Sequence, residues 1–338
     1  MLNCFFAGFN KRLSCTLYLF VAMGLFYAAC SNRKPQIYAG NEIDSRDKRE
    51  IDSIKIGIYK ALVNHNTSYL TGITNKKATE QQLAAYDTIS NTFNIHDSCN
   101  VENLSDYLIY NPSKLEYIDI HDTQSKFRYH FVSNVRYNYL TTFAIPDINT
   151  RTKWLVSCIF EKQDSLWKIT NVYMCQYSYD NLNLQNYFLY IKYLEKKNST
   201  IEAVLNAEIA VKLLGHRTFL HIENEDVARE YFIDLFKRAK LIYPFPFKVN
   251  VLNETIEIYA LKAELVKGSY YPLVFYRSNI PLQDAERLTI ENNELNKKIE
   301  VLYPGIDKIS DTILYNATNG SVSNRYRGEN QGFVKMLK

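Results

Sequence analysis

The chain has 338 residues, of which 46% are hydrophobic, and a formal net charge of +4 at pH 7. Proteins that bind nucleic acids usually carry a strong positive charge that attracts the phosphates. A net charge of +4 is too small for this, so we expect no nucleic-acid partner. The length and apolar content suffice for a sizeable core and favour two domains over one.

The N-terminal segment, residues 1–29, has the layout of a secretory signal peptide. Its only charges are Lys11 and Arg12, and the uncharged residues 13–29 that follow end in small side chains. This uncharged run of 17 residues is at the short end of the length that a helix needs to span a bilayer. A signal anchor therefore stays open as an alternative, as does a signal that is cleaved without lipidation.

The end of this segment, Ala28-Ala29-Cys30, resembles the lipobox of bacterial lipoproteins, although Tyr27 stands where that motif has an aliphatic residue. The resemblance implies cleavage before Cys30, lipid on its thiol, and a mature protein anchored in a membrane. By the same resemblance, Ser31 is compatible with the outer membrane, so we expect a cell-envelope protein that faces the periplasm. Residues 30–50 are polar and lack an apolar period, which predicts a flexible tether.

Two helices are predicted next. Residues 51–63 carry isoleucine and leucine at helical spacing. A second helix begins at Thr79, which forms a capping box with Gln82, and its apolar stripe extends to Phe93. Both patterns indicate amphipathic helices that bury one face.

From about residue 115 the apolar period changes to two, which predicts β-strands. In residues 127–143 seven apolar side chains, most of them aromatic, occupy odd positions, namely Phe127, Tyr129, Phe131, Val135, Tyr137, Tyr139 and Phe143. One straight strand of that length would be too long for a domain. We therefore expect a bent strand, or a hairpin with an odd-numbered loop, because only then do both sets share one face.

Two further strands are predicted at 153–161 and 166–177, around a turn formed by residues 163–165. With a three-residue loop, Cys158 would face position 170, and Cys175 would lie on the opposite face of the pleat, about 17 Å away. These two thiols should therefore not form a disulfide with each other, whereas Cys99 could reach either.

Over residues 51–178 the order of helices followed by curved strands resembles the nuclear-transport-factor-two-like and cystatin-like envelope domains. The closing segment of this region, CIFEKQDSLWKITNVYM, is part of the resemblance. The resemblance implies a sheet that wraps a helix into a cone. Enzymes of that group place an aspartate and a histidine inside the cone. Asp119 and His121 lie two apart on a predicted strand and so on one face, as an acid/base pair would require, although exposed polar residues give the same pattern. The pocket candidates are Tyr129, Phe131, Tyr137, Tyr139, Asp119 and His121.

Residues 179–318 predict a second α+β domain. Helices are expected at 199–213, 223–240 and 288–302, and strands at 255–266, 270–277 and 311–317. The sequences LIYPFPFK and SYYPLVFY either form aromatic contact surfaces or pack in the core. Residues 319–338 predict a mobile tail. The predicted fold class is α+β, with helices packed on curved antiparallel sheets in two domains.

Motifs that would identify a reaction are absent from the sequence. It has no phosphate-binding glycine loop, no Gly-x-Ser-x-Gly turn and no His-Glu-x-x-His helix, so we expect no cofactor and no metal. Two hypotheses follow. The first is a membrane-tethered, non-catalytic envelope lipoprotein that binds a partner protein or small ligand through an aromatic-lined cone. The alternative is an enzyme that uses Asp119 and His121 inside that cone.

Overall fold

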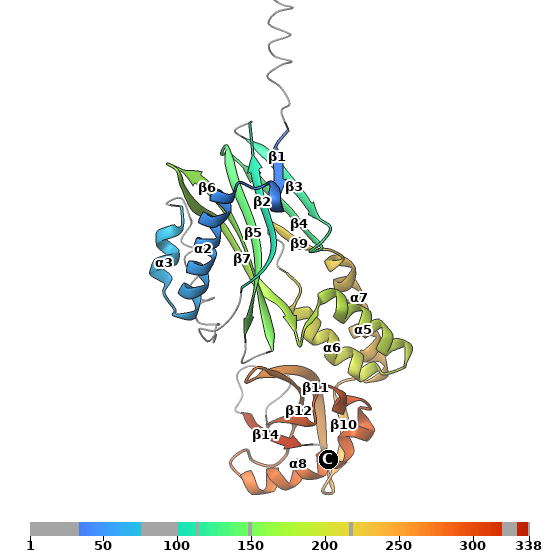
Figure 1. Cartoon of the computed structure of the whole chain (residues 1–338). Helices are drawn as coiled ribbons and strands as arrows, with labels where there is room; N and C mark the ends of the chain where they lie inside the picture. Colours follow the sequence, from blue (N-terminus) through green and yellow to red (C-terminus); the bar gives the residue numbers. More distant parts are fainter. Residues whose placement is uncertain are drawn as a thin grey trace, which may run out of the picture.

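The computed structural model describes residues 34–75, 101–112, 115–147, 151–215, 219–319 and 330–336. Three β-sheets form its framework, and helices pack against two of them (Figure 1). The fold is α+β, as predicted, and its largest sheet is curved and antiparallel.

The first sheet has six strands in the order β1-β2-β5-β6-β7-β8, and each neighbouring pair is antiparallel. These strands are β1 (Gln36–Ala39), β2 (Glu102–Tyr110), β5 (Tyr137–Asp147), β6 (Thr152–Gln163), β7 (Leu166–Tyr179) and β8 (Leu182–Asn183). Register shifts at Asn103/Ser105 and Ile159/Phe160 interrupt the ladders. Such bulges increase the local twist, which lets the sheet curl.

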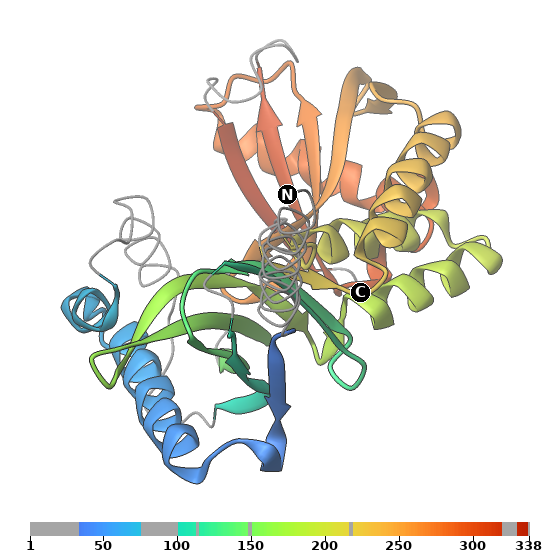
Figure 2. The same ribbon diagram turned by 90° about the horizontal axis from the view of Figure 1, so that it is seen from above.

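Two helices, α2 (Ser45–Val63) and α3 (Thr67–Ile73), pack on one face of this sheet, away from the second half of the chain (Figure 2). α2 begins where the carboxylate of Asp44 accepts a hydrogen bond from the amide of Arg46 at 2.7 Å. Its predicted apolar stripe, which includes Ile51 and Ile58, is buried against the sheet. The helix predicted at 51–63 therefore exists and begins six residues earlier.

A three-stranded antiparallel sheet in the order β3-β4-β9 covers the other face of the first sheet. Its strands are β3 (Glu116–Asp122), β4 (Phe127–Ser133) and β9 (Leu220–Ile222). Phe127 and Tyr129 of β4 are buried between the two sheets. Because β9 pairs with β4, the chain crosses back into the first half after residue 178, and the predicted domain boundary does not separate two independent units.

The aromatic residues of 127–143 do not share the single face that was predicted. The loop between β4 and β5, residues 134–136, has the expected odd number of residues, yet the two strands belong to different sheets. Tyr129 is buried between the sheets, whereas Tyr139 and Phe143 are buried on the opposite face, beneath α2. The prediction was wrong because the chain passes from one sheet to another at this loop. The buried odd-numbered aromatic side chains of β4 and of β5 therefore lie in two different hydrophobic cores.

β6 and β7 form the predicted hairpin with a shorter turn. Asp164 and Ser165 alone make the turn, and both have positive φ, at 47° and 69°. This is the backbone geometry that two-residue hairpin loops favour, because it matches the twist of the strands.

Because the turn is shorter than predicted, Cys158 and Cys175 face other residues in the register than expected. They still lie too far apart in the sheet to form a disulfide with each other. Cys158 pairs with Val172 and Cys175 pairs with Leu155 in the register. The two thiols are free and buried in different cores, on opposite faces of the sheet. The prediction that they form no disulfide with each other is confirmed. Cys99 lies outside the described residues.

The second half combines three helices with a five-stranded sheet and a fourth helix (Figure 1). Its helices are α5 (Leu184–Lys196), α6 (Thr200–Lys212), α7 (Glu225–Ile242) and α8 (Ala285–Leu302). Its strands are β10 (Phe247–Val251), β11 (Glu254–Val266), β12 (Ser269–Arg277), β13 (Thr312–Thr318) and β14 (Asn330–Met336), hydrogen-bonded in chain order. Helix α5 was not predicted, and the β12–β13 pair is parallel, unlike the antiparallel sheet expected.

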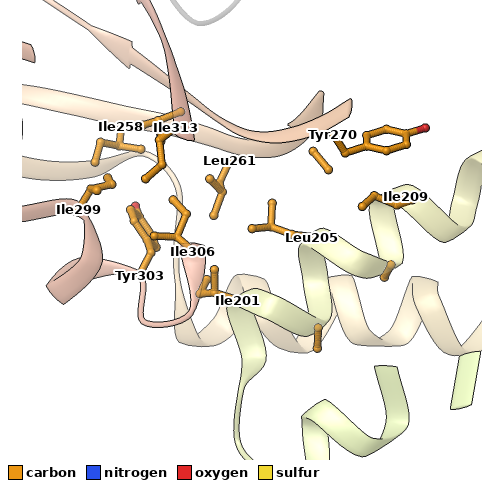
Figure 3. Close-up of a cluster of buried hydrophobic side chains, with 14 of the residues drawn as sticks. Ile201, Leu205, Ile209, Ile258, Leu261, Tyr270, Ile299, Tyr303, Ile306 and Ile313 are labelled. Carbon is orange, nitrogen blue, oxygen red and sulfur yellow. The ribbon is translucent and has the colours of Figure 1, made fainter. Parts of the chain in front are cut away.

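Helix α6 joins this sheet in one hydrophobic core. Ile201 and Leu205 of α6 point toward Leu261 of β11, with Tyr303 and Ile306 close by (Figure 3). All five side chains are less than 9% exposed. The three helices and the C-terminal sheet are therefore stabilised together.

Two segments that were expected to be flexible contain regular secondary structure. Residues 30–50 were expected to be a flexible tether, but β1, the 3-10 turn Gly40–Glu42 and the start of α2 lie within them. Residues 319–338 were expected to be mobile, but β14 pairs with β13 as the edge of the C-terminal sheet. The helix predicted at Thr79–Phe93 and the lipidation site Cys30 lie outside the described residues.

Candidate functional site

The proposed acid/base pair, Asp119 and His121, lies on the outer face of the β3-β4-β9 sheet. Both side chains are exposed, and the alternate positions Ile118 and Ile120 fill the core between the sheets. The alternation that places them on one face is therefore as predicted. That face is directed away from the interior where the cone hypothesis placed it.

The carboxylate of Asp119 is already paired with the guanidinium of Arg128. Its carboxylate accepts hydrogen bonds from Arg128 Nε at 3.3 Å and from a terminal nitrogen of Arg128 at 3.1 Å, and His130 Nδ1 lies 3.2 Å away. The hydrogen bonds from Arg128 are the main cause that lowers the pKa of Asp119. A carboxylate held ionised in this way is a poor proton acceptor at neutral pH.

An open cleft of about 530 Å³ separates this face from the start of α7. His121, Arg128, His130 and His221 line one side, and residues 224–227 line the other. The rings of His130 and His221 are 5.3 Å apart at their centroids. Burial is the main cause that lowers the pKa of His130, and the charge of Asp119 offsets part of that effect. Within the described part of the chain, no cluster of three or more His, Cys, Asp or Glu side chains could hold a metal ion.

The four aromatic pocket candidates do not line a common pocket. Tyr129 is fully buried, and its hydroxyl donates to Thr142 Oγ1 at 2.9 Å. Phe131 lies in the same core, and Tyr139 is buried on the other face of the sheet. Tyr137, the first residue of β5, is 41% exposed. The structure thus assigns three of these residues to packing and one to the surface.

A groove in the second half has the composition of a ligand site. It has a volume of about 560 Å³ and lies between α6, the end of α7 and β11. Its apolar lining residues are Ile201, Val204, Phe236, Ala239, Tyr243, Pro244, Phe245, Tyr259, Ala260 and Leu261. Small-molecule sites are typically concave and mostly apolar with a few polar groups, and this groove fits that description.

Three ionisable side chains supply those polar groups: Glu208, Lys240 and Lys262. The carboxylate of Glu208 accepts a hydrogen bond from the amide of Ala263 at 2.8 Å. Burial raises the pKa of Glu208, and the charge of Lys262 offsets part of that effect. The groove therefore offers apolar walls, a shielded carboxyl group and two ammonium groups.

The sequence contained a partial signal for this groove. The stretch LIYPFPFK fits either a contact surface or core packing, and its residues Tyr243, Pro244 and Phe245 line the groove. The α6 and β11 residues carried no such signal, because their apolar spacing only indicates a buried face.

No family model, no curated protein and no solved structure matches this chain. Among the described residues, none of the helices combines the length and the apolarity needed to cross a bilayer.

Proposed function

We propose that this protein is a lipoprotein of the bacterial cell envelope that binds a small ligand and catalyses no reaction. Lipid on Cys30 anchors it in the outer membrane, and the folded part faces the periplasm. The ligand has an apolar body and a polar end group. The observation that carries the binding role is the groove between α6, α7 and β11.

The lipid anchor is supported by the N-terminal sequence. An uncharged segment follows Lys11 and Arg12 and ends in Ala28-Ala29-Cys30, which resembles a lipobox. The first described strand, β1, begins at Gln36, six positions after the proposed lipid site.

The groove supports the choice of ligand chemistry. Aromatic and aliphatic walls favour an apolar body through burial of its surface. Lys240 and Lys262 supply hydrogen-bond donors for a polar end group, and Glu208 supplies an acceptor or, when protonated, a donor. The enzyme hypothesis has no comparable support, because Asp119 and His121 lie on an outer face.

Mass spectrometry of the mature protein tests the anchor. The expected result is an N-terminus at Cys30 whose mass includes diacylglycerol and an amide-linked acyl chain. Recovery of the protein with residues 1–29 attached, or with an unmodified Cys30, would disprove the anchor.

Titration with 1-anilinonaphthalene-8-sulfonate, an apolar anionic fluorophore, tests the groove. We expect saturable binding with enhanced fluorescence, weakened about tenfold or more by Val204→Asp, which places a charge on the apolar wall. Val301→Asp is the matched control because Val301 is 80% exposed and lies outside the groove. Circular dichroism establishes that both variants fold. Equal affinity of folded Val204→Asp and Val301→Asp would contradict the groove as the site.

A further inference from the structure

Five strand ends meet at one end of the first half of the molecule. β1 and β3 begin there, β2 and β4 end there, and β5 begins there, at the upper end of Figure 1. The pairing register requires this arrangement, because Gln36 pairs with Tyr110 and Tyr110 with Tyr137. We call this region the β1 end.

Large apolar side chains are exposed at the β1 end. They are Ile37, Leu115, Tyr117, Val132 and Tyr137, and their exposed fractions range from 40% to 72%. Tyr117 and Val132 are direct partners in the β3–β4 register, so their side chains lie next to each other on the outer face. Exposed apolar side chains that lie side by side, as Tyr117 and Val132 do, can mark a surface that contacts a membrane or a partner.

A cationic group accompanies the apolar side chains. The guanidinium of Arg136 lies over the ring of Tyr110, 5.5 Å from its centroid, and donates to the Tyr110 hydroxyl at 3.1 Å. The ring of Tyr137 lies 5.2 Å from that of Tyr110. Lys34, just before β1, is also exposed. Tyrosine and basic side chains together are the composition that favours a membrane–water interface.

The position of the proposed lipid site identifies what covers this surface. Cys30 precedes Gln36 by six positions, and six residues span at most about 20 Å even when fully extended. If the lipid of Cys30 is inserted in a bilayer, the β1 end is held close to the headgroups. Helix α8 lies at the opposite end of the molecule, so it is directed away from a bilayer that the β1 end contacts (Figure 1).

We propose that the β1 end is a membrane-contact surface, on which Tyr117, Val132, Tyr137 and Arg136 lie against the lipid headgroups. This inference rests on the proposed lipid anchor for its location, and it adds a defined orientation to it. The contact orders the protein on the bilayer, so the groove of the second half faces the aqueous space at a distance from the membrane.

Fluorescence quenching tests the contact in the intact lipidated protein. Val132→Trp and, as the matched control, Val301→Trp on α8 are reconstituted in vesicles of phosphatidylethanolamine and phosphatidylglycerol that carry brominated acyl chains. We expect added quenching for Val132→Trp and none for Val301→Trp, relative to the unsubstituted protein with its two native tryptophans. Equal quenching at both positions, with lipid on Cys30 shown by mass spectrometry, would overturn the contact while leaving the anchor intact.

A second measurement separates the contact from the anchor. The chain from residue 30 onward, with Cys30→Ser, is sedimented with the same vesicles. We expect weak binding that Tyr117→Ser/Val132→Ser lowers roughly fivefold or more, whereas Ile290→Ser/Val301→Ser leaves it unchanged. Equal binding by the two double variants would overturn the contact, whether or not Cys30 carries lipid.

The other occupant that such a surface could have is a second copy of the chain. Sedimentation velocity of the Cys30→Ser chain decides this. A monomer at all concentrations supports the bilayer as the occupant. A dimer that Tyr117→Ser/Val132→Ser dissociates would overturn the proposal, because the surface would then be an interface between copies.

Discussion

The ammonium of Lys55 lies 3.2 Å from Asp106 Oδ1, and the two side chains are only 5% and 3% exposed. Lys55 comes from α2 and Asp106 from β2, so this ion pair joins the helix to the sheet. Asn103 joins the cluster, since its amide donates to Asp106 Oδ2 at 2.6 Å and its oxygen accepts from Lys55 at 3.1 Å, and Asp52 Oδ1, which is half-exposed, lies 2.8 Å from the same ammonium.

Breaking this pair from one side should strongly destabilise the protein. Lys55→Met leaves the Asp106 carboxylate buried without its cation, and we expect it to lower the free energy of unfolding by about 3 kcal/mol. Lys55→Met/Asp106→Leu removes both charges and should cost less than Lys55→Met alone. Urea unfolding measures both changes. Arg46→Met, at an exposed pair with Glu50, is the control and should change stability by about 0.5 kcal/mol or less. A double variant less stable than Lys55→Met would contradict this account.

Two buried tyrosines should respond differently to loss of the hydroxyl. Tyr129 donates to Thr142 Oγ1, which in turn shares a 2.7 Å hydrogen bond with Ser157. The hydroxyl of Tyr303 is buried and has no hydrogen-bond partner among the described residues. We expect Tyr129→Phe to cost about 1 kcal/mol and Tyr303→Phe to be neutral or stabilising. Thermal unfolding of both variants measures the difference, and the reverse order would show that the hydrogen bonds are wrongly assigned.

Gly57 and Tyr69 fix the close approach of α2 and α3. A Cβ at Gly57 would lie 1.8 Å from the Tyr69 hydroxyl oxygen and 2.4 Å from the ring carbon that bears it. Alanine normally stabilises a helix interior by about 1 kcal/mol relative to glycine. Here we expect Gly57→Ala to destabilise by about 1 kcal/mol or more, because the ring must move.

Gly57→Ala should stabilise the protein once the side chain of Tyr69 is removed. In a Tyr69→Ala background the collision is absent, so the same substitution should raise stability by about 1 kcal/mol. A double-mutant cycle followed by chemical denaturation tests this. A stabilising effect of Gly57→Ala in the unsubstituted protein would show that α3 does not pack as described.

The raised pKa of Glu208 makes a pH prediction. Burial raises the pKa of Glu208 above the ordinary value of 4.5. The Glu208 carboxyl group of the folded protein therefore stays protonated over a pH range where that of the unfolded protein is already ionised. The stability contributed by Glu208 is therefore fully present below about pH 4.5 and is lost as pH rises toward the folded pKa. Glu208→Gln should remove this component, since an amide does not titrate.

The measurement is the difference in unfolding free energy between the unsubstituted protein and Glu208→Gln as a function of pH. We expect the difference to shift in favour of Glu208→Gln as pH rises from about 4.5 toward neutrality. All other titrating groups are common to both proteins, so their contributions to the pH dependence cancel in this difference. A difference that stays constant over that range would mean that the carboxyl group is not buried in the folded state.

The local patterns of the sequence predicted many elements, because a strand or helix is encoded by the period of its apolar residues. The helix over 51–63 and the hairpin over 153–177 were predicted in this way, as were the strands of 255–277. Lys55 illustrates the limit at the level of one residue. A lysine in an amphipathic helix predicts exposure, and only the facing Asp106 explains its burial.

The sequence by itself determined the α+β class, the alternation of buried and exposed positions along the outer strands β3 and β4, and the separation of Cys158 from Cys175. Only the tertiary structure decided which sheet each strand joins, and hence which core receives Tyr129 and which receives Tyr139. The physical reason is that a period of two defines two faces of a strand but carries no information about its neighbours. For the same reason the β4–β9 pair, the outward direction of Asp119 and His121, and the groove beside Glu208 follow from contacts between residues distant in the chain.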